Sequence, residues 1–431
     1  MDNFVLKLLS VRNFASFADC ATFTTAVDTS KKEHLDKTFA EGDFQYNRVS
    51  FLYGANGSGK TFFCKALIEI QRLLTFSPLT MADPSQLLTI PHFKHLGAPV
   101  APFAFDYDYI NEPTTFCIEV VLNGTIYHYE FSLRGKTVIY ELLTKKRRRT
   151  EKLLERTSPR FKDIVVRSDL KSFEPLKSTV KEEALCLPIA GMLNNPLAAK
   201  LVAGIQNINV VSMTSGKLDP LDPEETFSPE RLKRYITIMQ KADPTIRDIK
   251  VIFEEEEIAR NKLKTDDFEN REVVTRKLKV GVDSRHAVYQ KGCETSETSI
   301  NFFADESLGT IKLFTALPYL FDVLENGGTL VIDEIENGLH LSLAREIVQL
   351  FMSEDTNPFH AQLVCTSHQP LLVNGDFRRD QVWITSKDSH GKTSLHRMSD
   401  LKSSRAKVNL TNRILEGAFG CNPDLFFENN T

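Results

Sequence analysis

A glycine-rich stretch that ends in a lysine and a hydroxyl residue carries the clearest chemistry in this sequence. Gly54 and Gly59 have the spacing of a phosphate-binding loop, and Lys60 and Thr61 follow directly. The glycines let backbone N–H groups face an anion at the start of a helix, the lysine can reach the outer phosphates, and the threonine hydroxyl can bind Mg²⁺. We predict that a nucleotide is bound by eight consecutive residues: Gly54, Ala55, Asn56, Gly57, Ser58, Gly59, Lys60 and Thr61.

Two adjacent carboxylates, Asp333 and Glu334, end an apolar run farther along the chain. Beside a phosphate loop, the first carboxylate of such a pair can hold Mg²⁺, and the second can orient or deprotonate the attacking water. The alternative is that they are two acidic residues in a loop that happens to follow a strand. The phosphate loop in the same chain favours the first interpretation, which makes Asp333 a metal ligand and Glu334 a catalytic base.

Three more residues could act on the outermost phosphate of a nucleotide. Ser307 and Gly309 stand at the predicted start of a helix, where a hydroxyl and backbone N–H groups can contact a γ-phosphate. Ser307 could also be a simple N-cap of that helix. His368 ends the strand after the acidic one, where it could donate a hydrogen bond to the γ-phosphate or have a structural role. The order of the four features along the chain favours the functional interpretation.

Hydrophobic periodicity predicts the elements that position these residues. The apolar run at residues 49–53 predicts a buried strand before the phosphate loop, and apolar residues at helical spacing predict a helix over residues 62–74. Asn123-Gly124 is typical of a hairpin turn. Further strands are predicted at residues 5–11, 20–27, 115–122, 125–133, 136–144, 329–334, 362–366, 381–385 and 393–397, and further helices at residues 198–205, 229–241, 308–324, 339–351 and 408–420.

The predicted elements divide the chain into three parts. Residues 1–144 hold the phosphate loop, and residues 299–431 hold the Ser-Gly helix start, the acidic strand and the histidine. Between them, residues 145–298 form an inserted helical and mixed region, which opens with the basic run Lys145–Lys152. That run is either a solvated surface or a contact for nucleic-acid phosphates. We expect the insertion to be the recognition surface.

Composition is that of a globular protein and excludes several classes. The 431 residues are 42% hydrophobic and 26% charged, and the net charge of -4 gives no whole-molecule case for nucleic-acid binding. No apolar stretch approaches the roughly 20 residues that a membrane helix needs. The seven cysteines include no CxxC pair, which fits neither a disulfide framework nor a zinc site. We expect Cys64 and Cys365 to be buried free thiols, no membrane partner, and a reducing, cytoplasmic location.

These motifs, in this order, resemble the ABC-type ATPase heads of SMC proteins and their AAA relatives of the OLD-like group. The residues that carry the resemblance are Asn13–Phe17, Gly54–Thr61, Glu306–Thr310, Leu330–His340, Thr366–His368 and Glu416–Gly420. The resemblance implies an α/β P-loop fold of ABC-ATPase type, with an antiparallel β portion and an inserted, mainly helical region. It also implies that two heads dimerise and enclose two ATP molecules with Mg²⁺.

The resemblance further implies a role for each matching residue. Lys60 and Thr61 would bind phosphate and Mg²⁺, Asp333 would support the metal, and Glu334 would be the catalytic base. Ser307 and Gly309 would contact the nucleotide of the partner subunit, and His368 would sense the γ-phosphate. Glu336–His340 would form the loop through which two subunits communicate. Neither Gln71 nor Gln86 suits the glutamine loop of the family, so that metal contact has no assigned residue.

Proteins of the OLD group also carry a C-terminal Toprim nuclease, and the roughly sixty residues after His368 are too few for one. The chain thus resembles the stand-alone ATPase subunits of bacterial antiphage systems of the PARIS type. That resemblance implies a homo-oligomeric sensor and scaffold, a separately encoded effector such as a nuclease, and a phage protein as trigger. The alternative is an SMC-like DNA-binding or DNA-repair ATPase. A transporter ATPase is disfavoured because no glutamine loop is found.

Overall fold

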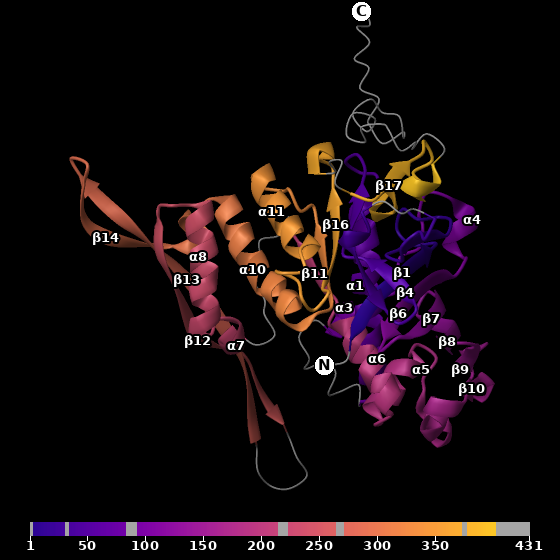
Figure 1. Ribbon diagram of the computed structural model, residues 1–431. Helices are drawn as coiled ribbons and strands as arrows, with labels where there is room; N and C mark the ends of the chain where they lie inside the picture. Colours follow the sequence, from indigo (N-terminus) through magenta and orange to yellow (C-terminus); the bar gives the residue numbers. More distant parts are fainter. Residues whose placement is uncertain are drawn as a thin grey trace, which may run out of the picture. The chain divides into compact units, whose positions relative to one another are not determined.

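The computed structural model describes residues 3–30, 34–82, 93–213, 223–263, 271–372 and 377–401. These residues form two compact units (Figure 1). Unit 1 comprises the described residues up to Ser212, Asp322–Glu336, and the described residues from Ala344 onward. Unit 2 comprises the described residues of Met213–Phe321 together with Asn337–Leu343.

A six-stranded, mainly parallel sheet in unit 1 carries the strand ends that hold the candidate site. Its order is β11 (Asn209–Ser212), β15 (Thr329–Asp333), β16 (Gln362–Ser367), β5 (Val49–Tyr53), β17 (Val382–Lys387) and β18 (Thr393–Arg397). Only the β17–β18 pair is antiparallel. Every residue of β5, β15 and β16 is buried, as their apolar sequences predict. Because parallel strands end at one edge of a sheet, the segments after β5, β15 and β16 lie along the same edge.

A seven-stranded antiparallel sheet is the second layer of unit 1. Its order is β10 (Ile164–Val166), β9 (Thr150–Arg156), β8 (Thr137–Lys146), β7 (Thr125–Arg134), β6 (Thr114–Leu122), β1 (Phe4–Arg12) and β2 (Ala21–Thr24). Helix α1 (Lys60–Leu79) shares one core with both sheets. Its Phe63 ring lies 5.1 Å from Phe23 on β2, whose ring lies 5.2 Å from Trp383 on β17. Burial of the α1 face therefore fixes the phosphate loop against the six-stranded sheet.

Shorter elements complete unit 1. The strands β3 (Thr38–Glu41) and β4 (Phe44–Asn47) pair with each other, and α5 (Cys186–Met192) and α6 (Pro196–Gln206) contact α1. The remaining helices of this part are α3 (Phe93–Leu96), α4 (Tyr107–Ile110), α11 (Leu341–Met352, which starts in unit 2), and the 3-10 segments η1 (Leu35–Lys37), η2 (Phe161–Asp163), η3 (Ser168–Thr179), η4 (Pro370–Leu372), η5 (Arg379–Gln381) and η6 (Met398–Asp400).

Unit 2 combines a long antiparallel ribbon with helices. Its strands are β12 (Ile246–Leu263), β13 (Arg271–Gln290) and β14 (Cys293–Asn301), and its helices are α7 (Pro223–Thr226), α8 (Pro229–Ala242), α9 (Phe302–Asp305) and the first part of α10 (Leu308–Asn326). The Phe314 ring of α10 lies 5.8 Å from Phe227 and 4.8 Å from Phe302, which gives this unit an aromatic core of its own.

The predicted α/β architecture with an antiparallel portion is confirmed, and the strands expected around residues 49–53, 115–144, 329–334, 362–366 and 381–397 are present. The helix predicted at residues 408–420 lies outside the described residues. None of the helices in the described ranges is both long enough and apolar enough to cross a membrane.

The structure differs from the expected start of an insertion at residue 145. Strands β9 and β10 extend the seven-stranded sheet, because Leu153 and Leu154 bury their side chains in the core of unit 1. The basic run Lys145–Lys152 therefore spans the turn between β8 and β9. The separate unit begins after Ser212 and combines helices with the strands of the ribbon β12–β14.

Candidate functional site

The phosphate loop leaves the buried end of β5 and enters α1 without an intervening residue. Gly57 and Gly59 have φ values of 77° and 108°, which favour glycine. Gly54 is required for a different reason: a Cβ there would collide with the hydroxyl and the carbonyl oxygen of Thr385. The loop is therefore shaped by glycines at the positions that sequence reasoning singled out.

Two threonines of the β17–β18 hairpin form hydrogen bonds with this loop. Thr385 Oγ1 lies 2.7 Å from Ser58 Oγ, and the Thr393 hydroxyl donates to the Ser58 carbonyl oxygen at 3.0 Å. Thr393 Oγ1 also lies 2.8 Å from Ser16 Oγ, which brings the Asn13–Phe17 segment to the loop. Sequence reasoning missed both threonines, although it predicted the hairpin that carries them.

Lys60 is buried at the mouth of the loop, with 4% of its surface exposed. Its Nζ donates hydrogen bonds to the carbonyl oxygens of Gly54 at 2.7 Å and Ala55 at 2.9 Å. Burial lowers the pKa of Lys60, and the nearby carboxylates of Glu334, Glu336 and Asp333 oppose that shift in this order of size. The structure thus brings together the lysine and the two acidic residues that the sequence placed in one site.

Asp333 ends β15 with 3% of its surface exposed, and Thr366 of the neighbouring strand holds it. The Thr366 hydroxyl donates to Asp333 Oδ1 at 2.7 Å and accepts the backbone N–H of Glu334 at 2.8 Å. Cys64, one turn into α1, places its thiol 3.9 Å from the same Oδ1. Asp333 is consequently fixed beside the start of α1, where a metal ion held by Thr61 would also lie.

Glu334 has a left-handed backbone with φ of 57°. Such a conformation is uncommon for residues other than glycine and costs of order 1–3 kcal/mol, so the surrounding contacts must hold it. The hydrogen bond from its N–H to Thr366 is one such contact. The backbone thus leaves the strand conformation directly after Asp333.

Replacing Thr366 with Val should lower the free energy of unfolding by about 1–3 kcal/mol. Valine has a similar shape but leaves the Glu334 N–H without its acceptor and Asp333 Oδ1 without its hydroxyl donor. Chemical denaturation of Thr366→Val and Thr366→Ser measures the effect, and the serine variant, which keeps a hydroxyl, is the matched control. Equal stability of the two variants would contradict this account of the turn.

Glu336 and His368 form a contact that the sequence did not predict. The His368 backbone N–H donates to Glu336 Oε1 at 2.6 Å, and His368 Nδ1 lies 2.9 Å from the same oxygen. The other oxygen, Oε2, is buried without a hydrogen-bond partner. Glu336 therefore holds the Nδ1 side of the His368 ring, and the His368 side chain is 45% exposed.

Ser307 and Gly309 lie in unit 2, at the start of α10. Ser307 Oγ accepts the backbone N–H of Thr310 at 3.1 Å, so this residue is the N-cap that the simpler interpretation expected. A Cβ at Gly309 would collide with the Gly338 carbonyl oxygen, and Lys312 Nζ donates to Asn337 Oδ1 at 2.8 Å. The loop that follows the acidic strand therefore packs directly on this helix start.

Glu306, just before the cap, ties the helix start to the ribbon of unit 2. Its Oε1 accepts the Ser284 hydroxyl at 2.6 Å and lies 2.8 Å from His286 Nε2, and both partners are on β13. Only 6% of its side chain is exposed. No spacing in the sequence indicated this contact, because 20 residues separate the two sides.

Gln71, one of the glutamines considered for a metal contact, is held elsewhere. Its Nε2 donates to the carbonyl oxygens of Ile205 at 2.9 Å and Ile208 at 2.7 Å. Gln86 lies outside the described residues. The glutamine-loop contact therefore has no assigned residue in the part of the chain that the structure describes.

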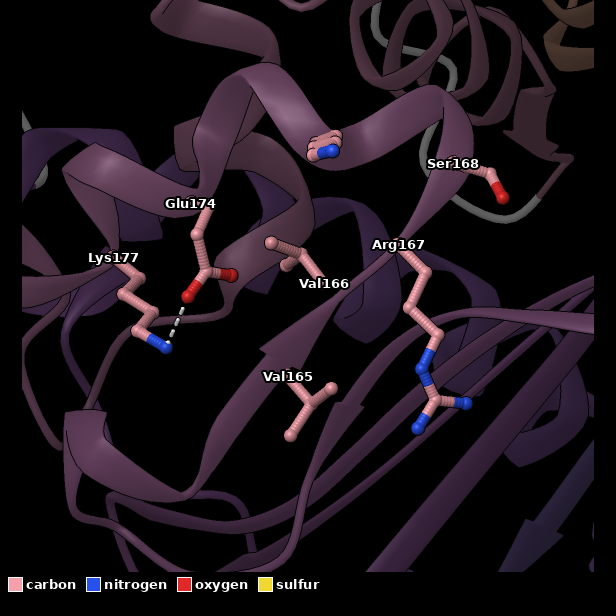
Figure 2. A pocket seen from close by; sticks show the side chains of 7 residues that line it. Val165, Val166, Arg167, Ser168, Glu174 and Lys177 are labelled. Carbon is pink, nitrogen blue, oxygen red and sulfur yellow. Dashed lines mark hydrogen bonds and ion pairs between the residues drawn. The ribbon is translucent and has the colours of Figure 1, made fainter.

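A separate pocket of about 450 Å³ lies between β10 and η3 (Figure 2). It is lined by Val165, Val166, Arg167, Ser168, Lys171, Glu174 and Lys177. Lys177 Nζ donates to Glu174 Oε1 at 2.6 Å, so one of its cations is neutralised within the pocket. None of the predicted site residues lines it.

The basic run is partly neutralised in the same region of unit 1. Lys145 Nζ lies 2.7 Å from Asp169 Oδ2 and 3.2 Å from Glu151 Oε2, and Lys152 Nζ lies 2.6 Å from Glu155 Oε1. The three arginines of the turn, at residues 147–149, are exposed. The run is thus a charged hairpin turn whose flanking lysines already have acidic partners.

A known protein family matches the parts of the chain that carry these residues. The family described as "AAA domain, putative AbiEii toxin, Type IV TA system" matches residues 49–183 and 214–374, which is more than half of the chain. No curated protein matches the chain.

Two solved structures align with most of the chain. "SMC head domain from Thermotoga maritima" is 11% identical, covers 91% of this chain and 98% of that chain, and has a TM-score of 0.36. "Crystal structure of the SmcHead bound to the C-winged helix domain of ScpA" is 13% identical, covers 91% of this chain and 96% of that chain, and has a TM-score of 0.43.

The family match includes the phosphate loop, the Ser307 helix start, Asp333, Glu334 and His368. The chain belongs to this AAA-domain family.

Proposed function

We propose that this protein binds ATP with Mg²⁺ at the phosphate loop and hydrolyses it. The observation that carries the proposal is the buried Lys60, whose ammonium group is held by loop carbonyls and faced by the carboxylates of Asp333, Glu334 and Glu336. The glycine loop, in which a Cβ at Gly54 or Gly59 would collide with Thr385 or Thr393 of the β17–β18 hairpin, and the buried Asp333 fit a magnesium nucleotide. Bound Mg²⁺ would neutralise charge that develops on the phosphates.

Each residue of the proposed site has a distinct part in this mechanism. The backbone N–H groups from Ala55 to Gly59 and the Lys60 ammonium group would bind the phosphates, while Thr61 and Asp333 would hold the metal. Thr366 keeps Asp333 oriented through its hydroxyl. Glu334, the first residue after β15, would accept the proton of the attacking water.

Two copies of the chain would share each nucleotide. Ser307 is exposed at the N-terminus of α10, and its neighbour Leu308 is 59% exposed, as expected for a helix start that contacts a partner. The hydroxyl of Ser307, the N–H of Gly309 and the positive end of the helix dipole would then contact the γ-phosphate bound by the other copy. In that other copy, which binds the nucleotide, His368 would contact the same γ-phosphate.

His368 depends on Glu336 in this mechanism, and Glu336→Ala should lower kcat for ATP by about 10- to 100-fold. Alanine releases both the ring and the backbone N–H of His368, whereas Glu336→Gln keeps an acceptor oxygen for both. Steady-state ATP turnover should show a loss in kcat with little change in KM, and partial rescue in the glutamine variant. Wild-type kcat in the alanine variant would show that His368 is positioned without Glu336.

In the cell, we propose that the ATP-bound oligomer is the sensor and scaffold of an antiphage system. It would restrain a separately encoded effector, such as a nuclease, until a phage protein triggers its release. The support is the order of its ATPase residues along the chain, which resembles that of the ATPase subunits of such systems. The test is to assay the isolated protein with Mg²⁺ and ATP for ATP turnover and for cleavage of DNA and RNA. We expect ATP turnover without cleavage, and intrinsic nuclease activity would contradict the proposal.

The second candidate is an SMC-like DNA-binding ATPase, and the exposed arginines at residues 147–149 favour it. A phosphate contact by these arginines would make DNA binding weaken steeply with salt. The acidic partners of Lys145 and Lys152 reduce the charge that the hairpin offers. Salt-dependent binding to DNA that disappears when the three arginines are neutralised would favour this function over the scaffold.

A further inference from the structure

A short turn between two helices of unit 2 places Glu306 directly before Ser307. Helix α9 ends at Asp305 and α10 begins at Leu308, which leaves Glu306 and Ser307 between them. Glu306 is extended, with φ of -76° and ψ of 162°, and its backbone N–H donates to the Phe302 carbonyl oxygen at 3.3 Å. The backbone of Glu306 therefore sets the direction in which the chain enters α10.

The carboxylate of Glu306 is bound to strand β13 of the ribbon. Its Oε1 accepts the Ser284 hydroxyl at 2.6 Å and lies 2.8 Å from His286 Nε2. Ser284 is fully buried, and the side chains of Glu306 and His286 are only 6% and 17% exposed. A buried carboxylate needs hydrogen-bond donors that replace its lost hydration, so these two donors determine where the Glu306 side chain lies.

His286 is held on its other side by the turn that leads into β12. Its Nδ1 lies 3.2 Å from Thr245 Oγ1. Thr245 donates its hydroxyl at 2.6 Å and its backbone N–H at 3.0 Å to Asp243 Oδ1, and Asp243 is the C-cap of α8. A line of polar contacts thus joins the end of α8, the ribbon and the start of α10, all within unit 2 (Figure 1).

Ser307 has one hydroxyl hydrogen to offer to a ligand. Its Oγ accepts the Thr310 backbone N–H at 3.1 Å and lies 2.7 Å from Thr310 Oγ1. When the Thr310 hydroxyl donates to Ser307, the Ser307 hydroxyl hydrogen is available for a phosphate oxygen. The direction of that hydrogen bond depends on the position of the Ser307 backbone, which directly follows Glu306.

We infer that Glu306 is a positioning residue for the shared nucleotide site. Through Ser284 and His286, the ribbon of unit 2 sets the geometry with which Ser307 contacts the γ-phosphate bound by the other copy. The inference rests on the proposed function, in which Ser307 makes that contact. A movement of the Glu306 backbone moves the Ser307 hydroxyl with it, and a misplacement of about 1 Å can lower a catalytic rate by about 100-fold.

The two donors on β13 also keep a negative charge from the start of α10. The N-terminus of a helix attracts anions, because its first N–H groups have no partner within the helix. A Glu306 carboxylate released from Ser284 and His286 would be free to turn to these N–H groups. There it would compete with the γ-phosphate, so the ribbon contacts both fix the turn and remove a competing anion.

Glu306→Ala tests the inference through ATP turnover and ATP-dependent assembly. We expect kcat to fall by about 10- to 100-fold and the assembly to weaken. The Kd of the single chain for ATP should equal that of the wild type, because the phosphate loop belongs to unit 1. Glu306→Gln keeps an acceptor oxygen for both donors and should recover most of kcat. Glu294→Ala, which removes a ribbon glutamate paired with Arg247, is the matched control and should keep the wild-type kcat.

Mixing two impaired variants shows in which copy Glu306 acts. In a pair that combines Glu306→Ala with Glu334→Gln, one shared site has the intact base of the first chain and the intact Ser307 turn of the second. Turnover of the mixture should therefore exceed that of either variant alone. If Glu306 acted on the nucleotide of its own chain, both sites of the pair would be impaired, and mixing would give no gain.

Wild-type kcat in Glu306→Ala, or no gain on mixing, would overturn the inference. If Glu306→Ala does not fold, as judged by circular dichroism, His286→Ala takes its place, because it removes one of the two donors and leaves the turn unchanged; wild-type kcat there would also overturn the inference. Ser307→Ala separates this inference from the proposed function. If Ser307→Ala is impaired and Glu306→Ala is not, only the inference fails, whereas a wild type that neither hydrolyses ATP nor assembles with it overturns both.

Discussion

Glu334→Gln should lower the rate of ATP hydrolysis by about 10²- to 10⁴-fold while ATP is still bound. Glutamine has the size of glutamate but cannot accept the proton of the attacking water. The substitution leaves the backbone turn, its N–H bond to Thr366, and the phosphate loop unchanged. A single-turnover assay with pre-bound ATP separates the chemical step from binding, so the loss should fall on the rate of the chemical step.

Glu346→Gln is the matched control, because this glutamate is exposed on α11 and is not part of the proposed site. It should hydrolyse ATP at the wild-type rate. A Glu334→Gln variant with wild-type turnover would mean that Glu334 is not the base, and Glu336 would then be the next carboxylate to replace.

Lys60→Ala should weaken ATP binding by about 10- to 100-fold, since a charge-assisted hydrogen bond contributes about 1.5–3 kcal/mol. The substitution removes the only cation of the described residues that both contacts the loop carbonyls and faces three carboxylates. Without that cation, the carboxylates of Asp333, Glu334 and Glu336 would repel the phosphates. Fluorescence titration with a labelled ATP analogue measures the change in Kd.

Lys65→Ala provides the control on the same helix, because Lys65 is exposed and lies over the Phe62 ring, away from the loop carbonyls. Its Kd should equal that of the wild type. Equal Kd values for Lys60→Ala and Lys65→Ala would contradict the role of Lys60 in phosphate binding, on which the ATPase proposal rests.

Local sequence patterns predicted most of the layer that holds the site. The phosphate loop requires glycines at fixed spacing, and buried parallel strands are apolar along their whole length, so Val49–Tyr53 and Thr329–Asp333 were recognisable without partners. The Ser307 cap was also foreseeable, because N-caps follow local rules. Whether Ser307 also contacts the nucleotide of a partner depends on a second chain, which the spacing of residues in one sequence does not describe.

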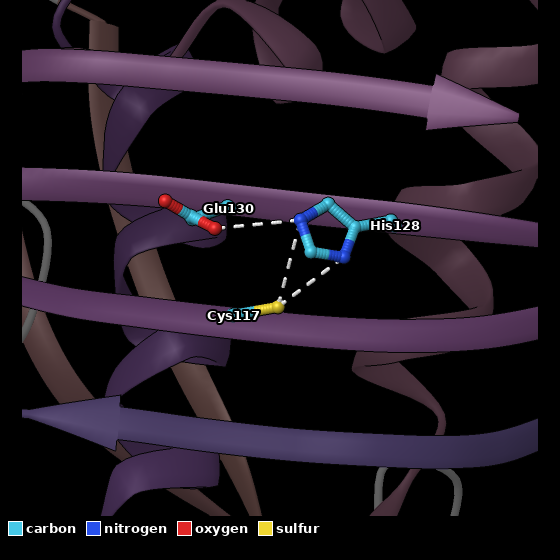
Figure 3. Close-up of side chains that lie close together, drawn as sticks. All are labelled: Cys117, His128 and Glu130. Carbon is cyan, nitrogen blue, oxygen red and sulfur yellow. Dashed lines mark hydrogen bonds and ion pairs between the residues drawn. The ribbon is translucent and has the colours of Figure 1, made fainter. Parts of the chain in front are cut away.

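The contacts that tune the site come from distant parts of the chain and could not be predicted from spacing. Thr385 and Ser58 are 327 residues apart, and Glu336 and His368 are 32 residues apart. Each pairing depends on which strands become neighbours and in which register. For the same reason, spacing did not reveal that the register of one hairpin places Cys117 opposite Glu130 and Glu119 opposite His128 (Figure 3).

The start of the separate unit was misplaced for a related reason. The basic run Lys145–Lys152 suggested a break in the fold, whereas β8 and β9 continue the sheet on either side of the turn that it spans. A charged hairpin turn and a domain boundary have the same composition. Only the burial of Leu153 and Leu154 in the sheet core separates them.

The most direct test of the shared-site ATPase is the solution mass of Glu334→Gln with and without Mg-ATP. Each chain has a mass of 48.9 kDa. The account predicts a dimer or larger assembly that forms with Mg-ATP and is more persistent in Glu334→Gln than in the wild type, because ATP is no longer consumed. A mass of one chain under both conditions, in a protein that binds ATP, would contradict it and leave Ser307 as a helix cap alone.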